Sequence, residues 1–128
     1  MKILIIDDDH RNIFALKIAL KSRGLHAFGC LDAREGLELL KQDSDFDVVL
    51  LDMMMPECDG FEVLEIIRND SVDEYPPVIA VTAKAMKGDR ERCLMAGADG
   101  YVAKPVDIDI LLKEIDGVTS KKSNEPSK

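Results

Sequence analysis

The chain has 128 residues, of which 46% are hydrophobic and 33% are charged, proportions typical of one globular domain with a single buried core. Its net charge of −8 opposes direct binding to nucleic acid or to an anionic membrane, because both depend mainly on clustered Lys and Arg side chains. No apolar run approaches the roughly 20 residues that cross a bilayer, and aspartates interrupt the first run where a secretory signal would continue, so we expect a cytoplasmic protein whose partners are proteins.

Five short apolar segments alternate with five longer segments of helical character. The predicted strands span residues 2–6, 26–30, 47–51, 78–82 and 101–103. The predicted helices span residues 11–23, 33–43, 60–69, 86–96 and 107–116. A strict alternation of strand and helix predicts an α/β fold, in which a parallel sheet carries helices on both faces.

The first, third and fourth strands are continuous apolar runs, ILII, VVLL and VIAV, as expected for central strands buried on both faces. Gly24 and Gly97 follow the first and fourth helices, where glycine adopts the left-handed conformation at little steric cost. After Val118 the chain is polar and lacks the apolar surface that would offset the entropy of ordering it. We therefore expect one domain over 1–117 and a disordered tail over 118–128.

Carboxylates follow two of the predicted strands. Asp7 and Asp8 come directly after the first strand, and Asp52 directly after the third. Ligands of open α/β sheets bind outside the carboxyl ends of the strands, so the three side chains converge if these strands are neighbours. Two carboxylates about 4 Å apart repel by roughly 4 kcal/mol at an effective dielectric of about 20, and such a cluster calls for a cation. Mg²⁺ fits best, because it binds through one or two carboxylates together with water and phosphate oxygens.

Two further polar residues lie at strand ends on the same edge: Thr82 closes the fourth strand, and Lys104 follows the fifth. A hydroxyl donor and a fixed positive charge are what a transferring phosphoryl group requires, and they make Asp52 the natural nucleophile. Each residue alone has an ordinary structural explanation, but their joint placement favours phosphoryl chemistry. Asp9 is better explained as the cap of the first helix than as a ligand.

Four segments carry a familiar combination of residues: KILIIDDD, DVVLLDMMMPECDGFEVL, PPVIAVTA and DGYVAKPVD. Over nearly the whole chain they resemble the receiver domains of two-component response regulators. The segments DMMMPECDG and TAKAMKGDRERCLMAGADGYVAKPVD are most similar to receivers of hybrid histidine kinases. The resemblance implies a flavodoxin-like sheet of order 2-1-3-4-5 with five helices.

The resemblance also implies how the site works. Asp52 is then the phosphorylated residue, and Mg²⁺ is bound by Asp7, Asp8, Asp52 and the backbone carbonyl of Met54. The phosphodonor is a histidine kinase or a histidine phosphotransfer protein, and the output passes to a downstream protein target. The chain would catalyse its own phosphorylation and slow dephosphorylation and otherwise act as no enzyme.

The resemblance implies further roles for residues at the ends of the fourth and fifth strands. Thr82 becomes the switch hydroxyl, Lys104 the phosphate-binding lysine and Tyr101 the aromatic switch residue. The Lys104–Pro105 bond is expected to be cis. Lys84 and Met54 flank the water that attacks the phosphoryl group, and a thioether cannot orient that water, so we expect slow autodephosphorylation.

The first helix has two apolar sides. Leu16 and Leu20, with Ile13 beside them, form the side expected to face the sheet. Phe14 and Ile18 lie one turn apart on the other side, where they could receive a phosphohistidine donor. A contact with a neighbouring helix or a self-association surface explains the pair equally well.

Two other functional classes compete with the receiver hypothesis. A phosphohydrolase of the haloacid-dehalogenase type also forms an aspartyl-phosphate, but it requires a second Asp two residues after the nucleophile, where Met54 stands. A flavodoxin-like electron carrier requires a phosphate-binding loop rich in Ser, Thr and Gly after the first strand, where the chain has an acidic run.

Overall fold

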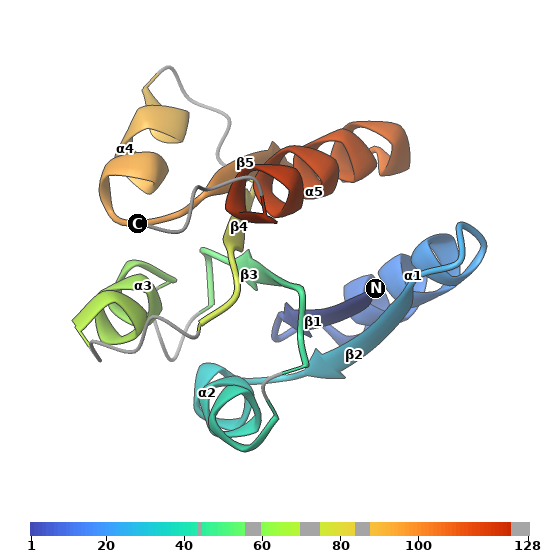
Figure 1. Ribbon diagram of the computed structural model, residues 1–128, viewed down its shortest axis with the longest axis horizontal. Coiled ribbons are helices and arrows are strands. Elements are labelled where there is room, and N and C mark those ends of the chain that lie inside the picture. Colours follow the sequence, from blue (N-terminus) through green and yellow to red (C-terminus); the bar gives the residue numbers. More distant parts are fainter. Residues whose placement is uncertain (44, 56–59, 70–74, 84–87, 124–128) are drawn as a thin grey trace.

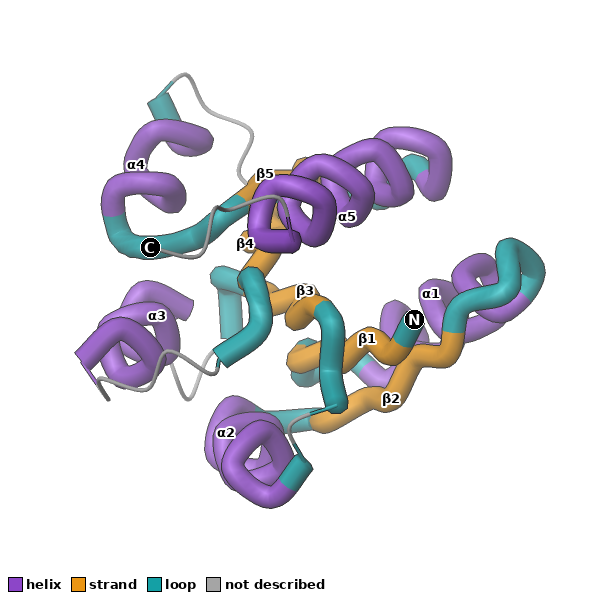
Figure 2. The backbone as a smooth tube through the Cα atoms, viewed as in Figure 1, coloured by secondary structure: helices purple, strands orange, loops and turns teal. Residues whose placement is uncertain are grey.

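The computed structural model contains a five-stranded parallel sheet with the strand order β2-β1-β3-β4-β5, as predicted. It describes residues 1–43, 45–55, 60–69, 75–83 and 88–123. The strands are β1 (Lys2–Ile6), β2 (His26–Cys30), β3 (Val48–Asp52), β4 (Val78–Thr82) and β5 (Gly100–Ala103). Figure 2 shows the strands in the middle of the molecule with helices on both sides.

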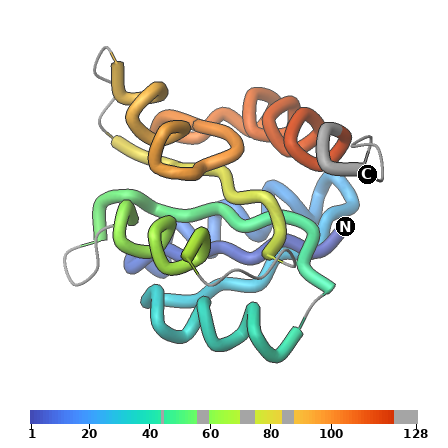
Figure 3. Tube along the Cα trace, turned by 60° about the vertical axis from the view of Figure 1, so that its left-hand side comes forward, coloured from blue at the N-terminus to red at the C-terminus, as the bar shows by residue number. Residues whose placement is uncertain are grey.

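The helices form two layers on the faces of this sheet. They are α1 (His10–Lys21), α2 (Ala33–Gln42), α3 (Gly60–Asn69), α4 (Asp89–Met95) and α5 (Ile108–Ser123). Helices α1 and α5 cover one face, and α2, α3 and α4 lie side by side on the other (Figures 1 and 3). The connections that leave the carboxyl ends of β1 and β3 therefore lead to helices on opposite faces of the sheet.

The central strands are buried on both faces because their apolar side chains alternate between two cores. On β1, Leu4 and Ile6 belong to the core beneath α2, α3 and α4, whereas Ile3 and Ile5 belong to the core beneath α1 and α5. All residues of β3 and β4 are buried. The continuous apolar runs in the sequence are therefore central strands buried on both faces, as predicted.

Local signals at the helix ends are confirmed. The Asp9 side chain accepts a hydrogen bond from the backbone N–H of Arg11 and caps α1. Gly24 and Gly97, which follow α1 and α4, have φ values of +81° and +117°. Both lie in the left-handed region that favours glycine.

The prediction of a helix over 86–96 was wrong at its start. Helix α4 begins at Asp89, because Gly88 has a φ of +89° and does not continue a helix toward the N-terminus. Residues 86 and 87 lie outside the described part of the chain.

The predicted end of the last helix at residue 116 was also wrong, because α5 continues to Ser123. The helix extends into the segment expected to be a tail. Val118 is buried in the same core as Leu111 and Ile115, and this spacing continues the inward stripe of the helix by another turn. The rest of the expected tail lies outside the described residues. None of the helices described has the length and apolar composition needed to cross a membrane.

Two of the three cysteines, Cys30 and Cys93, are free and buried, and Cys58 lies outside the described residues. Burial raises the pKa of the Cys30 thiol to about 11 and also raises that of Cys93. Both side chains are therefore protonated at neutral pH and serve as packing residues.

Candidate functional site

Three carboxylates meet at the carboxyl ends of two neighbouring strands. Ile6 of β1 pairs with Leu51 of β3, so the residues that follow, Asp7 and Asp52, are also neighbours. One oxygen each of Asp7, Asp8 and Asp52 can be chosen such that all three lie within 4.8 Å of one another. Asp7 and Asp52 are each only 3% exposed, whereas Asp8 is exposed. The convergence predicted from the sequence is therefore confirmed.

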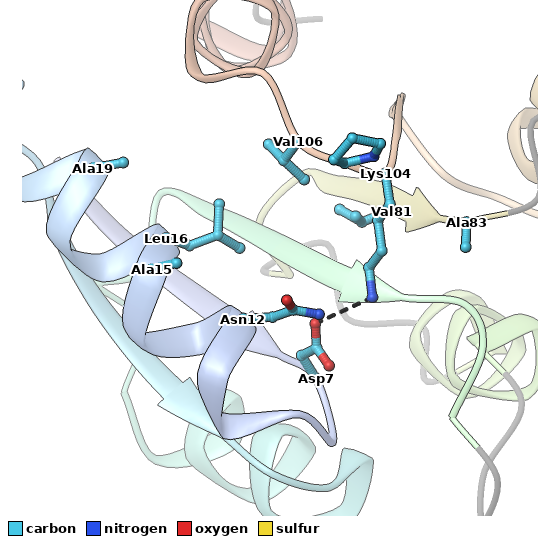
Figure 4. Close-up of a pocket in the computed structure, with 10 residues that line it drawn as sticks. Asp7, Asn12, Ala15, Leu16, Ala19, Val81, Ala83, Lys104 and Val106 are labelled. Atoms are coloured by element: carbon cyan, nitrogen blue, oxygen red, sulfur yellow. Dashed lines mark hydrogen bonds and ion pairs between the residues drawn. The ribbon is translucent and has the colours of Figure 1, made fainter.

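Lys104 reaches toward this cluster from the end of β5, and Figure 4 shows its side chain directed at Asp7. Its Nζ lies 3.5 Å from Oδ2 of Asp7 and 3.5 Å from Oδ2 of Asp52. The backbone N–H of Lys104 donates to the carbonyl of Thr82 at 2.8 Å, which ties the end of β5 to the end of β4. The Lys104–Pro105 bond is cis, as expected.

Backbone donors orient the two buried carboxylates. The N–H of Met54 donates to Oδ1 of Asp52 at 3.0 Å, and the N–H of Asp9 donates to Oδ1 of Asp7 at 2.9 Å. Both carboxylates thus use one oxygen for a backbone hydrogen bond and turn the other toward Lys104. The positions of these oxygens follow from the tight turns after β1 and β3.

The charge of the cluster is incompletely balanced. Burial raises the pKa of Asp52, as does the nearby charge of Asp7, while the Met54 N–H and the Lys104 ammonium act in the opposite direction. By formal charge, three carboxylates and one ammonium leave an excess of two negative charges, which one divalent cation would balance. The oxygen ligands suit a hard cation, and the site has the composition of a divalent metal site.

The two residues expected to switch lie on β4 and β5. Thr82 is the last residue of β4 and is 2% exposed. It follows Val81, which pairs with Asp52, so it lies beside the acidic cluster. Tyr101 is partly buried on β5, and its hydroxyl donates to Oδ2 of Asp89 on α4 at 3.4 Å. Sequence reasoning did not identify Asp89.

Helix α1 presents two exposed apolar side chains and also borders the site. Phe14 and Ile18 are 66% and 54% exposed, which confirms that they point away from the sheet. A pocket of about 590 Å³ separates α1 from the segment after β5 and reaches Asp7 and Lys104 (Figure 4). Its other walls include Asn12, Ala15, Leu16, Ala19, Pro105 and Val106.

Asn12 was also missed by sequence reasoning, although it lines this pocket near Asp7. The available signal was its place in the first turn after the Asp9 cap, directly above the end of β1. Lys84, which was expected to flank the attacking water, lies outside the described residues.

Comparisons with known proteins agree with this geometry. Residues 3–116 match the model of the response regulator receiver domain family. Histidine kinase 3 of Arabidopsis thaliana is 32% identical over 146 aligned positions, which include 98% of this chain and 14% of that kinase. The polar-differentiation response regulator DivK of Brucella anthropi is 31% identical over 113 positions, which include 88% of this chain and 91% of DivK.

Among solved structures, the receiver domain of the Francisella response regulator 1452 has a TM-score of 0.84 and 29% identity, covering 94% of this chain and 98% of its own. The family match covers nearly the whole chain, and it includes the strand ends where the acidic cluster and Lys104 lie. The chain therefore belongs to the response regulator receiver domain family of two-component signalling.

Proposed function

We propose that the chain accepts a phosphoryl group on Asp52 from the phosphohistidine of a histidine kinase or a histidine phosphotransfer protein, and thereby switches a protein-binding surface. One observation carries this proposal: the Lys104 ammonium lies 3.5 Å from each of two buried carboxylates in a three-carboxylate cluster. A buried, oriented carboxylate beside a fixed positive charge is the arrangement that phosphoryl transfer requires.

Asp7, Asp8 and Asp52, with the backbone carbonyl of Met54, would hold Mg²⁺. When bound, the metal neutralises the charge that builds up between the carboxylates and the phosphoryl oxygens. The unmatched charge of the cluster and its oxygen ligands support this assignment.

The phosphoryl transfer itself depends on side chains and backbone groups of the chain. An Asp52 oxygen forms a bond to phosphorus as the bond from the donor's histidine nitrogen breaks. Lys104 pairs with a phosphoryl oxygen, and the Thr82 hydroxyl donates a hydrogen bond to another. The backbone N–H of Met54 keeps Oδ1 of Asp52 in place during the transfer.

Phosphorylation is read out at the other end of β5. When Thr82 turns toward the phosphoryl group, the Tyr101 ring moves inward, and the surface formed by α4, β5 and α5 shifts between two states. A downstream protein that binds one state more tightly than the other receives the signal.

The phosphodonor docks on α1. Phe14 and Ile18 supply exposed apolar area on this helix, and other side chains of the same helix line a pocket that reaches Asp7 and Lys104. A helix of the donor placed along α1 would therefore bring a phosphohistidine to the acidic cluster.

Acetyl-phosphate with Mg²⁺ tests the proposal directly. Intact-mass spectrometry should show the addition of one phosphoryl group, which EDTA prevents and Asp52→Asn abolishes. Undiminished labelling in EDTA, or a stable adduct on another residue of the Asp52→Asn variant, would contradict it. Turnover of general phosphoesters would instead indicate the phosphohydrolase, and bound flavin the electron carrier.

A further inference from the structure

A buried carboxylate lies on α4, outside the acidic cluster. The buried polar or charged side chains of the described residues are Asp7, Asp52, Thr82 and Asp89, and the first three belong to the site described above. Asp89 is 7% exposed and lies in the first turn of α4. A buried charge is costly unless polar partners compensate for the lost hydration.

Two side chains contact the Asp89 carboxylate. The Tyr101 hydroxyl lies 3.4 Å from Oδ2, and Nη1 of Arg92 lies 3.7 Å from Oδ1. The arginine is on the same helix, one turn later, and its side chain is 69% exposed. The tyrosine comes from β5, so this hydrogen bond joins the helix to the sheet.

The backbone of Tyr101 is held separately from its ring. Its N–H donates to Oε2 of Glu114 on α5 at 3.1 Å, and Oε1 of Glu114 lies 4.0 Å from Nη1 of Arg90 on α4. This second carboxylate fixes the strand between the two helices. The contact of the Tyr101 backbone with Glu114 is therefore separate from the contact of its hydroxyl with Asp89.

The chemistry of the pair suits a neutral donor and a charged acceptor. Burial raises the pKa of the Tyr101 hydroxyl, and the nearby Asp89 carboxylate raises it further. The phenol therefore stays protonated at neutral pH and donates to the carboxylate. Hydrogen bonds to a charged acceptor are the stronger kind.

We propose that Asp89 is a positioning residue that holds the Tyr101 ring against α4 in the unphosphorylated chain and so opposes the switch of the surface formed by α4, β5 and α5. The link to Asp52 rests on the proposed function, whereas the hold on the ring does not. An interaction present in only one of two states favours that state, so removing it should make the other easier to reach.

The effect of Asp89 on the position of the Tyr101 ring can be measured without any ligand. The chain contains two tyrosines, so protein labelled with 3-fluorotyrosine gives two ¹⁹F resonances, which Tyr101→Phe assigns. Asp89→Ala should shift or broaden the Tyr101 resonance and leave that of Tyr75 unchanged. Asp89→Asn keeps an acceptor oxygen and should keep the Tyr101 resonance near its original position.

A matched control separates this hold from a general effect on the helix. Glu91 is an exposed acidic residue of the same first turn, so Glu91→Ala removes a comparable helix-terminal charge without touching Tyr101. An equal change in Glu91→Ala and Asp89→Ala, or no change in Asp89→Ala, would overturn the proposal. If Asp89→Ala fails to fold, Asp89→Ser serves in its place, because serine is tolerated near a helix start but is too short to reach the phenol.

The coupling to the acidic site is measured with beryllofluoride and Mg²⁺. Asp89→Ala should bind this phosphoryl mimic about three- to tenfold more tightly than the original chain, and Glu91→Ala should match the original. An altered Tyr101 resonance with unchanged affinity would overturn the coupling to the switch. Failure of the original chain to bind beryllofluoride would count against the proposed function. The ligand-free NMR result would still decide whether Asp89 positions the Tyr101 ring.

Discussion

At the scale of single residues, Asp52 combines strong burial with a charged neighbour. The carboxylate is 3% exposed, and burial together with the Asp7 charge raises its pKa. Ionised Asp52 is thus less favourable in the folded chain than in the unfolded one. This cost is the physical reason why a cation or a phosphoryl group should be attracted to the site.

Replacing Asp52 with Asn should therefore stabilise the metal-free chain at neutral pH. We expect the melting temperature to rise by a few degrees, since 1 kcal/mol corresponds to about 3–6 °C in a domain of this size. Because the folded-state pKa is raised, the original chain gains stability as pH falls through that pKa, and the gain ends near 3.8, the ordinary pKa of an aspartate in the unfolded chain. The difference between the two proteins should accordingly shrink on acidification, as thermal unfolding monitored by circular dichroism can show.

Mg²⁺ provides the control for this prediction. The metal should raise the melting temperature of the original chain and have much less effect on Asp52→Asn, because one of the ligands is gone. A lower melting temperature of the variant at neutral pH without metal would contradict the account of Asp52.

The second prediction concerns the rate of autodephosphorylation and the residue two positions after Asp52. The Met54 side chain is 48% exposed and has only a weak thioether acceptor with which to orient an attacking water. Met54→Asn should speed autodephosphorylation by about tenfold, less than the 10²–10⁴ typical of a full general base. The decay of the phosphorylated species is followed by intact-mass spectrometry. Met95→Asn, at a position 89% exposed on α4, is the matched control and should not change the rate.

At the scale of elements, α3 packs so closely on the turn after β3 that glycine is required at its start. A Cβ atom at Gly60 would lie 2.7 Å from the backbone Cα of Met53. Neither helix nor turn can absorb this overlap without moving the segment that follows Asp52. In α5, by contrast, a Cβ atom at Gly117 would meet nothing within 4 Å.

The two glycines should therefore respond in opposite directions to the same substitution. Gly60→Ala should lower the free energy of unfolding by about 1–3 kcal/mol through overpacking. Gly117→Ala should raise it by about 0.5–1 kcal/mol, because alanine loses less backbone entropy than glycine in a helix. Urea denaturation measures both values. Equal effects of the two substitutions would show that helix propensity, and not contact with Met53, governs Gly60.

At the scale of the whole molecule, α1 borders the acidic site and also carries the exposed side chains of Phe14 and Ile18. Other side chains of α1 line the pocket that reaches Asp7 and Lys104. A protein donor should therefore depend on α1, whereas a small donor that reaches the site alone should not.

The double variant Phe14→Ala with Ile18→Ala tests this dependence. We expect transfer from a phosphohistidine donor to slow by at least about tenfold, since the loss of two central apolar contacts commonly costs more than 1.4 kcal/mol of binding. Labelling by acetyl-phosphate should stay nearly unchanged. Ile66→Ala, which truncates an exposed apolar residue on α3 at the other face, is the control.

Donor-dependent rates distinguish the possible outcomes. Equal losses with both donors would mean that Phe14 and Ile18 support the fold. No loss with either donor would mean that the phosphohistidine donor docks on another surface. Loss of self-association in the double variant would favour an interface between copies of the chain.

Much of this architecture follows from local patterns in the sequence. Central strands appear as continuous apolar runs, and helix ends are marked by the Asp9 cap and by Gly24 and Gly97. The positions of Asp7, Asp52, Thr82 and Lys104 at the carboxyl ends of four strands depend only on where those strands end. Such features involve residues close together in the chain, and short-range periodicity and backbone preference are sufficient to reveal them.

Other features depend on how distant segments pack. The strand order followed from a family resemblance, and only the sheet itself brings Lys104 within 3.5 Å of Asp7 and Asp52. The hydrogen bond from Tyr101 to Asp89 requires α4 to lie against β5, and the last turns of α5 depend on the burial of Val118 in the core shared with α1. No local pattern specifies these contacts, because their free energy arises only when elements distant in the sequence exclude water from one another.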